Sequence, residues 1–311
     1  TPRDAANGAR AVASERPPVP ARAGAAFSAT LSAKEEFMDI QETLGRALSA
    51  VFAPFTFISS LARGDRIFHP DGVVYRAEVK ALAHDGPLGA LAKKLAGTAI
   101  VRLSGGLWPW PQSERRPDVL GVSARFRAHD EVTPKKQPGD QDLLFVTSKS
   151  LVGLVVAPLR TRVGDYLDND YYAILPFMLA DVGEVYLRMV PEMRSPSGED
   201  RNDRLARAVE RGTAVLRMDL QIGSRTNPWI PLAALSLTEH LKFDEYALTF
   251  TPSSAAYSLA PYGALTLLWA ALYRQQACGA WGGDWYIDPV RQPLTFARAA
   301  KLLDQAAPPA P

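Results

Sequence analysis

The fold can be inferred from the segment Arg66-Ile67-Phe68-His69-Pro70-Asp71-Gly72 and its continuation, Val73-Val74-Tyr75-Arg76-Ala77-Glu78-Val79. Pro70 and Gly72 are typical of a turn. Beyond the turn, Val73, Tyr75, Ala77 and Val79 alternate with a second set of residues that includes two charged side chains. This period of two predicts a strand with one buried face.

His69 lies at the entrance to this predicted strand and is one of only four histidines in the chain. A histidine beside an apolar strand, with Arg66 three residues earlier, can act as an acid or a base in a pocket. The same pattern fits a core or turn histidine whose ring is hydrogen-bonded to the backbone. Both interpretations stay open on these residues alone, because a histidine is only a statistical marker of a functional site.

Similar alternation recurs along the chain and predicts about eight strands, a number that can close a small barrel with a filled interior. The predicted strands cover 73–79, 98–104, 122–126, 142–148, 185–189, 216–222, 232–237 and 246–251. Alternation favours antiparallel pairing, in which one face of each strand is turned towards a core. We therefore predict an α+β fold, an antiparallel β-barrel with surrounding helices.

Apolar residues at helical spacing predict helices between these strands and at both ends of the chain. The predicted helices cover 32–51, 87–95, 203–211, 260–278 and 296–306. Residues 1–30 are rich in Ala, Pro and Arg without periodicity and are expected to form an extended or disordered arm. Residues 31–305 are expected to form a single domain, followed by a Pro-rich tail at 306–311.

The composition excludes several classes of protein. A net charge of +2 does not favour binding to nucleic acid or to an anionic membrane. The single cysteine, Cys278, cannot form an internal disulfide or a multi-cysteine zinc site. No apolar run is long enough for a transmembrane segment, so we expect a soluble protein, with the cytoplasm favoured over the periplasm. Asp168-Asn169-Asp170 lacks the later Gly and Glu of a calcium loop and predicts a turn or a helix start.

Taken in order, several segments between residues 60 and 275 resemble the catalase-like haem protein superfamily, especially its smaller catalase-related members. Arg66-x-x-His69-x-x-Gly72 resembles the family's distal-histidine segment, and Val101-Arg102-Leu103-Ser104 resembles its Val-Arg-Phe-Ser strand. Residues 116–126 and 169–177 resemble two further segments. Residues 261–273 lie where those members carry the helix with the proximal tyrosine.

The resemblance implies a role for each matching residue. His69 would stand over a haem b group and move peroxide protons, and Phe68 beside it would contact the haem. Arg66 and Arg102 would pair with the haem propionates, whose carboxylates suit the planar guanidinium. Tyr273, as a phenolate, would be the axial ligand of the haem iron. Without the resemblance, the arginines would be read as partners in salt bridges and Tyr273 as a core tyrosine.

The chain departs from the family pattern at three positions. Thr147 stands where the family has a distal asparagine, and a hydroxyl cannot copy an amide. Trp269 and Ala280 occupy positions where the family places arginines near the proximal tyrosine. A phenolate without an arginine partner loses a charge-assisted hydrogen bond. The departures therefore suggest weakened dismutation of hydrogen peroxide.

These observations predict a haem-dependent peroxidase related to catalases, acting on hydrogen peroxide or on organic hydroperoxides, with His69 and Thr147 as catalytic residues. One alternative is rearrangement of a lipid hydroperoxide, as in the allene oxide synthases of the same superfamily. The other is a non-enzymatic barrel subunit that has lost its haem chemistry. Either a homo-oligomer or a larger assembly is compatible with the sequence.

Overall fold

The computed structural model describes residues 72–106, 116–150, 152–173, 175–243, 247–250, 257 and 259–261. Every described residue belongs to the same structural unit of the chain. The predicted arm at 1–30, the domain boundary near 305 and the tail lie outside the described residues. So do the predicted helices at 32–51 and 296–306.

Ten strands form one antiparallel sheet in the described part of the chain. They are β1 (Gly72–Ala81), β2 (Gly97–Gly105), β3 (Leu120–Phe126), β4 (Gln141–Val146), β5 (Tyr171–Tyr172), β6 (Phe177–Leu179), β7 (Gly183–Pro191), β8 (Val215–Ile222), β9 (Ile230–His240) and β10 (Leu259–Pro261). The neighbour order is β10-β6-β7-β5-β4-β3-β2-β1-β9-β8, and β8 pairs in turn with β7. Leaving out β6 and β10, eight strands therefore form a closed ring, which confirms the predicted α+β antiparallel barrel.

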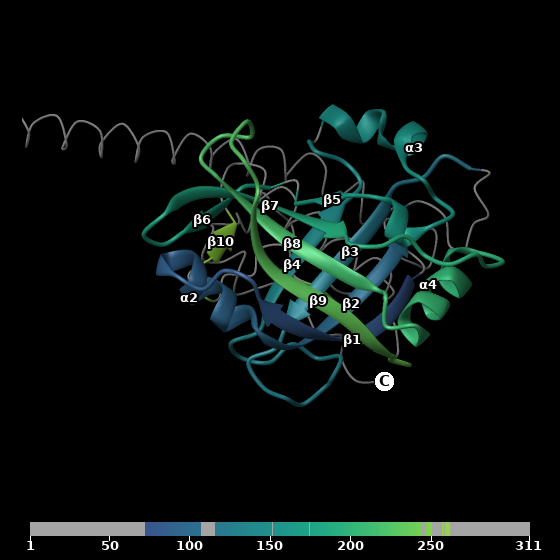
Figure 1. The fold of residues 1–311 in the computed structure, drawn as a ribbon, viewed down its shortest axis with the longest axis horizontal. Coiled ribbons are helices and arrows are strands. Elements are labelled where there is room, and N and C mark those ends of the chain that lie inside the picture. The colour runs from purple at the N-terminus through teal and green to yellow at the C-terminus, as the bar shows by residue number, and fades with distance from the viewer. Residues whose placement is uncertain are drawn as a thin grey trace, which may run out of the picture. The chain divides into compact units, whose positions relative to one another are not determined.

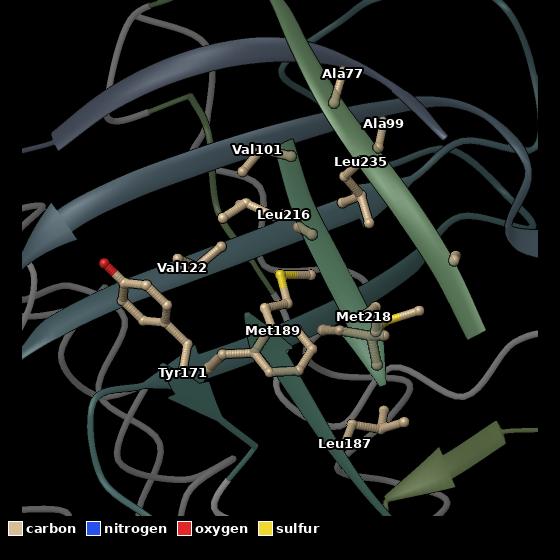
Figure 2. Close-up of a cluster of buried hydrophobic side chains, with 14 of the residues drawn as sticks. Ala77, Ala99, Val101, Val122, Tyr171, Leu187, Met189, Leu216, Met218 and Leu235 are labelled. Carbon is tan, nitrogen blue, oxygen red and sulfur yellow. The ribbon is translucent and has the colours of Figure 1, made fainter. Parts of the chain in front are cut away.

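The barrel interior is filled by apolar side chains from every long strand of the ring. In Figure 1, β8 and β9 pass in front of β2, β3 and β4, and the core lies between these two walls. Figure 2 shows Val101 and Val122 of one wall facing Leu216 and Met189 of the other. Burial of this apolar surface is the main driving force for closing the ring.

Two helices contribute apolar side chains to the same core. Helix α2 (Gly86–Leu95) begins with a proline in its first turn and contributes Leu91 and Leu95. Helix α4 (Arg201–Glu210) contributes Leu205, and its N-cap Asp200 accepts hydrogen bonds from two backbone amides of the first turn. The remaining helical segments are the short α3 (Ala157–Arg160) and two 3-10 turns, η1 (Val152–Val155) and η2 (Tyr166–Asp168).

The sequence prediction differs from the structure at two predicted segments, 246–251 and the start of 260–278, and it lacks the short strands β5 and β6. The eighth strand of the ring is β5, whereas the sequence predicted a strand at 246–251; its described residues 247–250 form a turn and irregular chain. The helix predicted from Ala260 is wrong at its first residues, because Leu259–Pro261 pairs with β6 as a strand. The rest of that predicted helix lies outside the described residues.

No helix in the described part of the chain combines the length and the apolar character needed to cross a membrane.

Candidate functional site

The structure describes two of the six predicted site residues, Arg102 and Thr147. The other four, which include the predicted iron ligand Tyr273, lie outside the described residues, as do Trp269 and Ala280. Those four are Arg66, Phe68, His69 and Tyr273. The roles predicted for all six therefore stay predictions. Of the predicted site, the structure describes the surroundings of Arg102 on β2 and of Thr147 after β4.

Arg102 is buried on the outer face of β2, with 3% of its surface exposed. The register places it directly opposite Val74 of β1 on one side and Ser123 of β3 on the other. Interior positions on β2 are held by Val101 and Leu103, so Arg102 points away from the barrel core. An outward side chain that is still buried shows that this outer face is covered.

Gly72, the first residue of β1, makes room for the Arg102 side chain. A Cβ atom at residue 72 would lie 2.8 Å from Cζ of Arg102 and 2.7 Å from the carbonyl oxygen of Leu103. Both distances are too short for real contacts, so the close approach requires glycine. Gly72, predicted from the sequence as a turn residue, therefore has a second role: it allows the Arg102 guanidinium to pack closely against the backbone of β1.

An apolar cluster lies on the same outer face, next to Arg102. Its buried members are Val74, Ile100, Leu248 and Phe250. Val74 and Ile100 share the Arg102 side of β1 and β2, because residues two apart on a strand face the same way. A buried guanidinium beside apolar side chains suits a flat apolar group that carries carboxylates, and haem is such a group.

A buried ion pair between Arg125 and Asp142 lies farther along this face. Arg125 Nε donates to Asp142 Oδ1 at 2.7 Å, and both side chains are fully buried. The guanidinium also donates to the carbonyl oxygens of Pro134 and Thr249, and it lies 5.1 Å from the centre of the Phe250 ring. The pair thereby fixes residues 249–250 against β3 and β4. Alternation in the sequence placed Arg125 on the outer face and gave no sign that this face is covered.

Thr147 follows β4 and takes part in a chain of hydrogen bonds. Its Oγ1 accepts from the backbone N–H of Leu120 at 3.1 Å and lies 2.7 Å from Oγ1 of Thr161. Thr161 donates its own proton to the carbonyl of Ala157 at 2.9 Å, so Thr147 is the donor between the two hydroxyls. The chain of bonds links the start of β3 to the start of α3.

Thr147 and Arg102 do not point into a common space in the described structure. Thr147 lies on the side of β4 that includes the interior residue Phe145, whereas Arg102 is on the outer face. Thr147 lines a cleft with a volume of about 820 Å³ that does not include Arg102. The cleft lies between the end of β4, the η1–α3 segment, the η2–β5 turn and the end of β7.

The cleft has a mixed lining with many charged groups. Its walls are formed by Thr147, Ser148, Lys149, Ser150, Gly153, Val156, Ala157, Arg160, Thr161, Arg162, Leu167, Asp168, Asn169, Asp170, Tyr172, Pro191, Glu192, Met193 and Arg194. The predicted turn at 168–170 forms one wall. There, the Asn169 side chain accepts from the Arg162 backbone N–H and donates to the carbonyls of Arg162 and Asp165.

Two arginines of the cleft share one carboxylate. Asp168 forms ion pairs with Arg162 at 2.6 Å and with Arg194 at 2.8 Å. Because both arginine side chains are largely exposed, each pair contributes little to stability. Their effect is to place two guanidinium groups around a single negative charge.

Tyr172 is held firmly at the base of the cleft. Its hydroxyl donates to Asp170 at 3.1 Å, and its ring lies 6.3 Å from the ring of Trp229, centre to centre. The Lys149 amino group lies 5.3 Å from the centre of the Tyr172 ring. Burial, assisted by the Asp170 charge, raises the pKa of Tyr172 to about 12, so its phenol is neutral at physiological pH.

Within the described residues, no group of three or more His, Cys, Asp or Glu side chains is arranged to hold a metal ion.

Comparison with known proteins finds similarity at the level of structure. No family model matches the chain, and no curated protein matches its sequence. Among solved structures, the chain is similar to a fungal catalase, with 11% sequence identity and a TM-score of 0.49 over 74% of this chain. The chain spans 62% of the length of that catalase.

Proposed function

We propose that the protein binds haem b and acts as a peroxidase on hydrogen peroxide or organic hydroperoxides, with weak dismutation. The observation that carries this proposal is the placement of three segments that resemble catalase segments. The register pairs Gly72, which ends the His69 segment, with Ser104, and pairs Arg102 with Ser123 of the third segment. The three segments are thus neighbours on one sheet.

Gly72, which ends the segment that resembles the distal-histidine segment, lies against the Arg102 guanidinium. This contact supports the proposal that the two segments contribute to one site.

In the proposed site, Arg102 and Arg66 pair with the carboxylates of the cofactor, and the Tyr273 phenolate is the iron ligand. His69 takes a proton from the peroxide and returns it to the departing oxygen, help that is commonly worth about 10²–10⁴ in rate. When bound, haem supplies the redox chemistry of peroxide cleavage. The Thr147 hydroxyl is engaged with Leu120 and Thr161 and does not share a space with Arg102, so it offers no free hydrogen bond beside the proposed haem, which supports slow dismutation.

The proposal is tested by the visible absorbance spectrum of the protein purified from cells supplied with haem precursor. The wild-type protein should carry haem, and Tyr273→Phe should lose it. Arg102→Ala should bind haem about tenfold more weakly, the loss expected for one charge-assisted hydrogen bond. The control variant Arg211→Ala changes an exposed arginine beyond α4 and should leave haem binding unchanged.

Turnover of two peroxides separates the alternatives. A haem-loaded protein should oxidise an added reductant with hydrogen peroxide or with an organic hydroperoxide, and it should evolve oxygen slowly. Conversion of a lipid hydroperoxide without consumption of reductant would favour the rearrangement reaction. Protein that stays colourless with excess haem would contradict the proposal and favour a non-enzymatic subunit.

A further inference from the structure

The cleft beside Thr147 has features of a ligand site that are independent of haem. Its volume of about 820 Å³ lies within the range of about 300–1,000 Å³ that is common for small-molecule sites. It is not lined by Arg102 or by the outer-face cluster. Its occupant can therefore be inferred from the cleft's own charges and apolar groups.

The charges of the cleft favour an anion. Four cationic side chains line it, against the three carboxylates of Asp168, Asp170 and Glu192. Two of the cations, Arg162 and Arg194, are ion-paired with Asp168. Among the described residues, no carboxylate is paired with the other two, Lys149 and Arg160. These two cations are therefore available to a negative ligand.

The apolar groups of the cleft favour a ligand that carries a ring. Val156 and Met193 line it and are 42% and 56% exposed, and Leu159 next to Arg160 is 77% exposed. In the described part of the chain, the only other exposed large apolar side chain is Leu82. Clustered exposed apolar side chains mark binding surfaces more often than isolated ones do. Met193 and the Tyr172 ring are suited to contact with an aromatic group.

We propose that this cleft binds an aromatic organic anion. The charged group of the ligand lies between Lys149 and Arg160, and its ring lies against Met193, Val156 and the edge of Tyr172. The neutral phenol of Tyr172 adds no negative charge beside the ligand and keeps a rigid wall through its bond to Asp170. Carboxylates and phosphate esters share the required chemistry, and the test below distinguishes them.

The probe for the test is anilinonaphthalene sulfonate, an aromatic anion whose fluorescence rises on binding. Phenyl phosphate, benzoate and inorganic phosphate are added as competitors. Phenyl phosphate or benzoate should displace the probe, and the tighter of the two identifies the preferred anion. Inorganic phosphate should displace it at least tenfold more weakly, because it lacks the ring. Equal displacement by inorganic phosphate would overturn the proposal.

Paired variants locate the binding. Lys149→Gln with Arg160→Gln should weaken probe binding by about fivefold to twentyfold, as expected for two partly exposed charge contacts. Lys93→Gln with Arg211→Gln makes the same change of charge on exposed residues elsewhere and should have no effect. Met193→Ser should also weaken binding, and its control Leu82→Ser should not. Equal losses in variants and controls would contradict the assignment.

Two further measurements complete the test. Circular dichroism and thermal unfolding should be the same for all variants, because every altered side chain is at least partly exposed. Sedimentation with phosphatidylserine vesicles distinguishes a membrane surface from a small ligand. If the wild-type protein sediments, the Lys149/Arg160 variant does not, and phenyl phosphate fails to displace the fluorescent probe, the cleft is a membrane contact and the proposal is wrong. The outcome does not depend on whether the protein carries haem.

Discussion

Gly72 both belongs to a predicted turn and makes room for the buried guanidinium of Arg102. Gly72 has no side chain to pack, and its lack of a Cβ atom lets the Arg102 guanidinium approach the backbone closely. This contact could not be read from sequence, because alternation places Arg102 on the outer face but says nothing of what covers it. The place of Arg102 on a strand was predictable from the sequence, whereas the burial of its side chain was not.

We expect Gly72→Ala to destabilise the protein by about 1–3 kcal/mol, the usual cost of forcing an extra group into a packed site. Arg102→Ala should remove part of that clash. The double variant should therefore cost less than the sum of the two single changes. Urea unfolding of the four proteins measures the coupling. Additive costs would show that the clash with the Leu103 carbonyl dominates and that Arg102 is free to move aside.

Tyr172 makes stability depend on pH in the alkaline range. Its pKa is about 12 in the folded protein, above the ordinary value of 10.0 for the unfolded chain. Below pH 10 both states keep the proton, so the contribution is constant. Between pH 10 and 12 only the unfolded state loses it, so the free energy of unfolding should fall as pH rises. Tyr172→Phe should reduce this slope in urea unfolding measured across that range. An unchanged slope would show that the phenol titrates normally.

At the scale of single elements, capping can be tested at α4. Asp200 accepts hydrogen bonds from the backbone N–H groups of Asn202 at 2.8 Å and Asp203 at 2.9 Å. Asp200→Ala should lower the free energy of unfolding by about 0.5–2 kcal/mol, the usual cost of losing an N-cap. The neighbouring Glu199→Ala is the control, because the Glu199 side chain is exposed and caps nothing. Equal losses in both variants would argue against the cap.

Most elements of the barrel were predictable because one face of each strand is apolar and buried. Helix α2 and helix α4 were also foreseen, each bounded by a glycine with positive φ, Gly97 and Gly212. The strand β5 was missed because two residues, Tyr171 and Tyr172, are too few to show a period. Conversely, Leu248 and Phe250 alternate like a strand but serve to cover the outer face. The alternation of Leu248 and Phe250 arises because both side chains are buried, although the segment does not pair with the sheet.

The candidate site was less predictable than the fold. Sequence resemblance selected Arg102, which the structure places on a buried outer face. The charged cleft was not anticipated, because its lining comes from four separate segments between Thr147 and Arg194. Two sequence predictions fell in this region: the 168–170 cluster, interpreted as a turn, and Thr147, assigned to a haem site. Spatial convergence of short loops leaves no local pattern for sequence reasoning to detect.

At the scale of the whole molecule, closure of the ring by β7 and β8 should make the barrel one cooperative unit. Native-state hydrogen exchange measures this directly. The amides of Val101 and Val122 on one wall and of Leu187 and Leu216 on the other should report the same free energy of opening. Amides of the exposed loop at 223–227 should exchange much faster. A lower value confined to β7 and β8 would show that the closing seam opens by itself.

The position of β1 between β2 and β9 has a consequence for synthesis on the ribosome. β2 follows β1 almost immediately, but the contact between Arg76 and Thr238 joins residues 162 positions apart. At a synthesis rate of about 5–20 residues per second, β9 is made roughly 8–30 s after β1, so one edge of β1 stays unpaired for that time. Throughout that interval a newly made apolar strand lacks its partner. The nascent chain is therefore an expected client of ribosome-associated chaperones, which would shield that edge until β9 emerges.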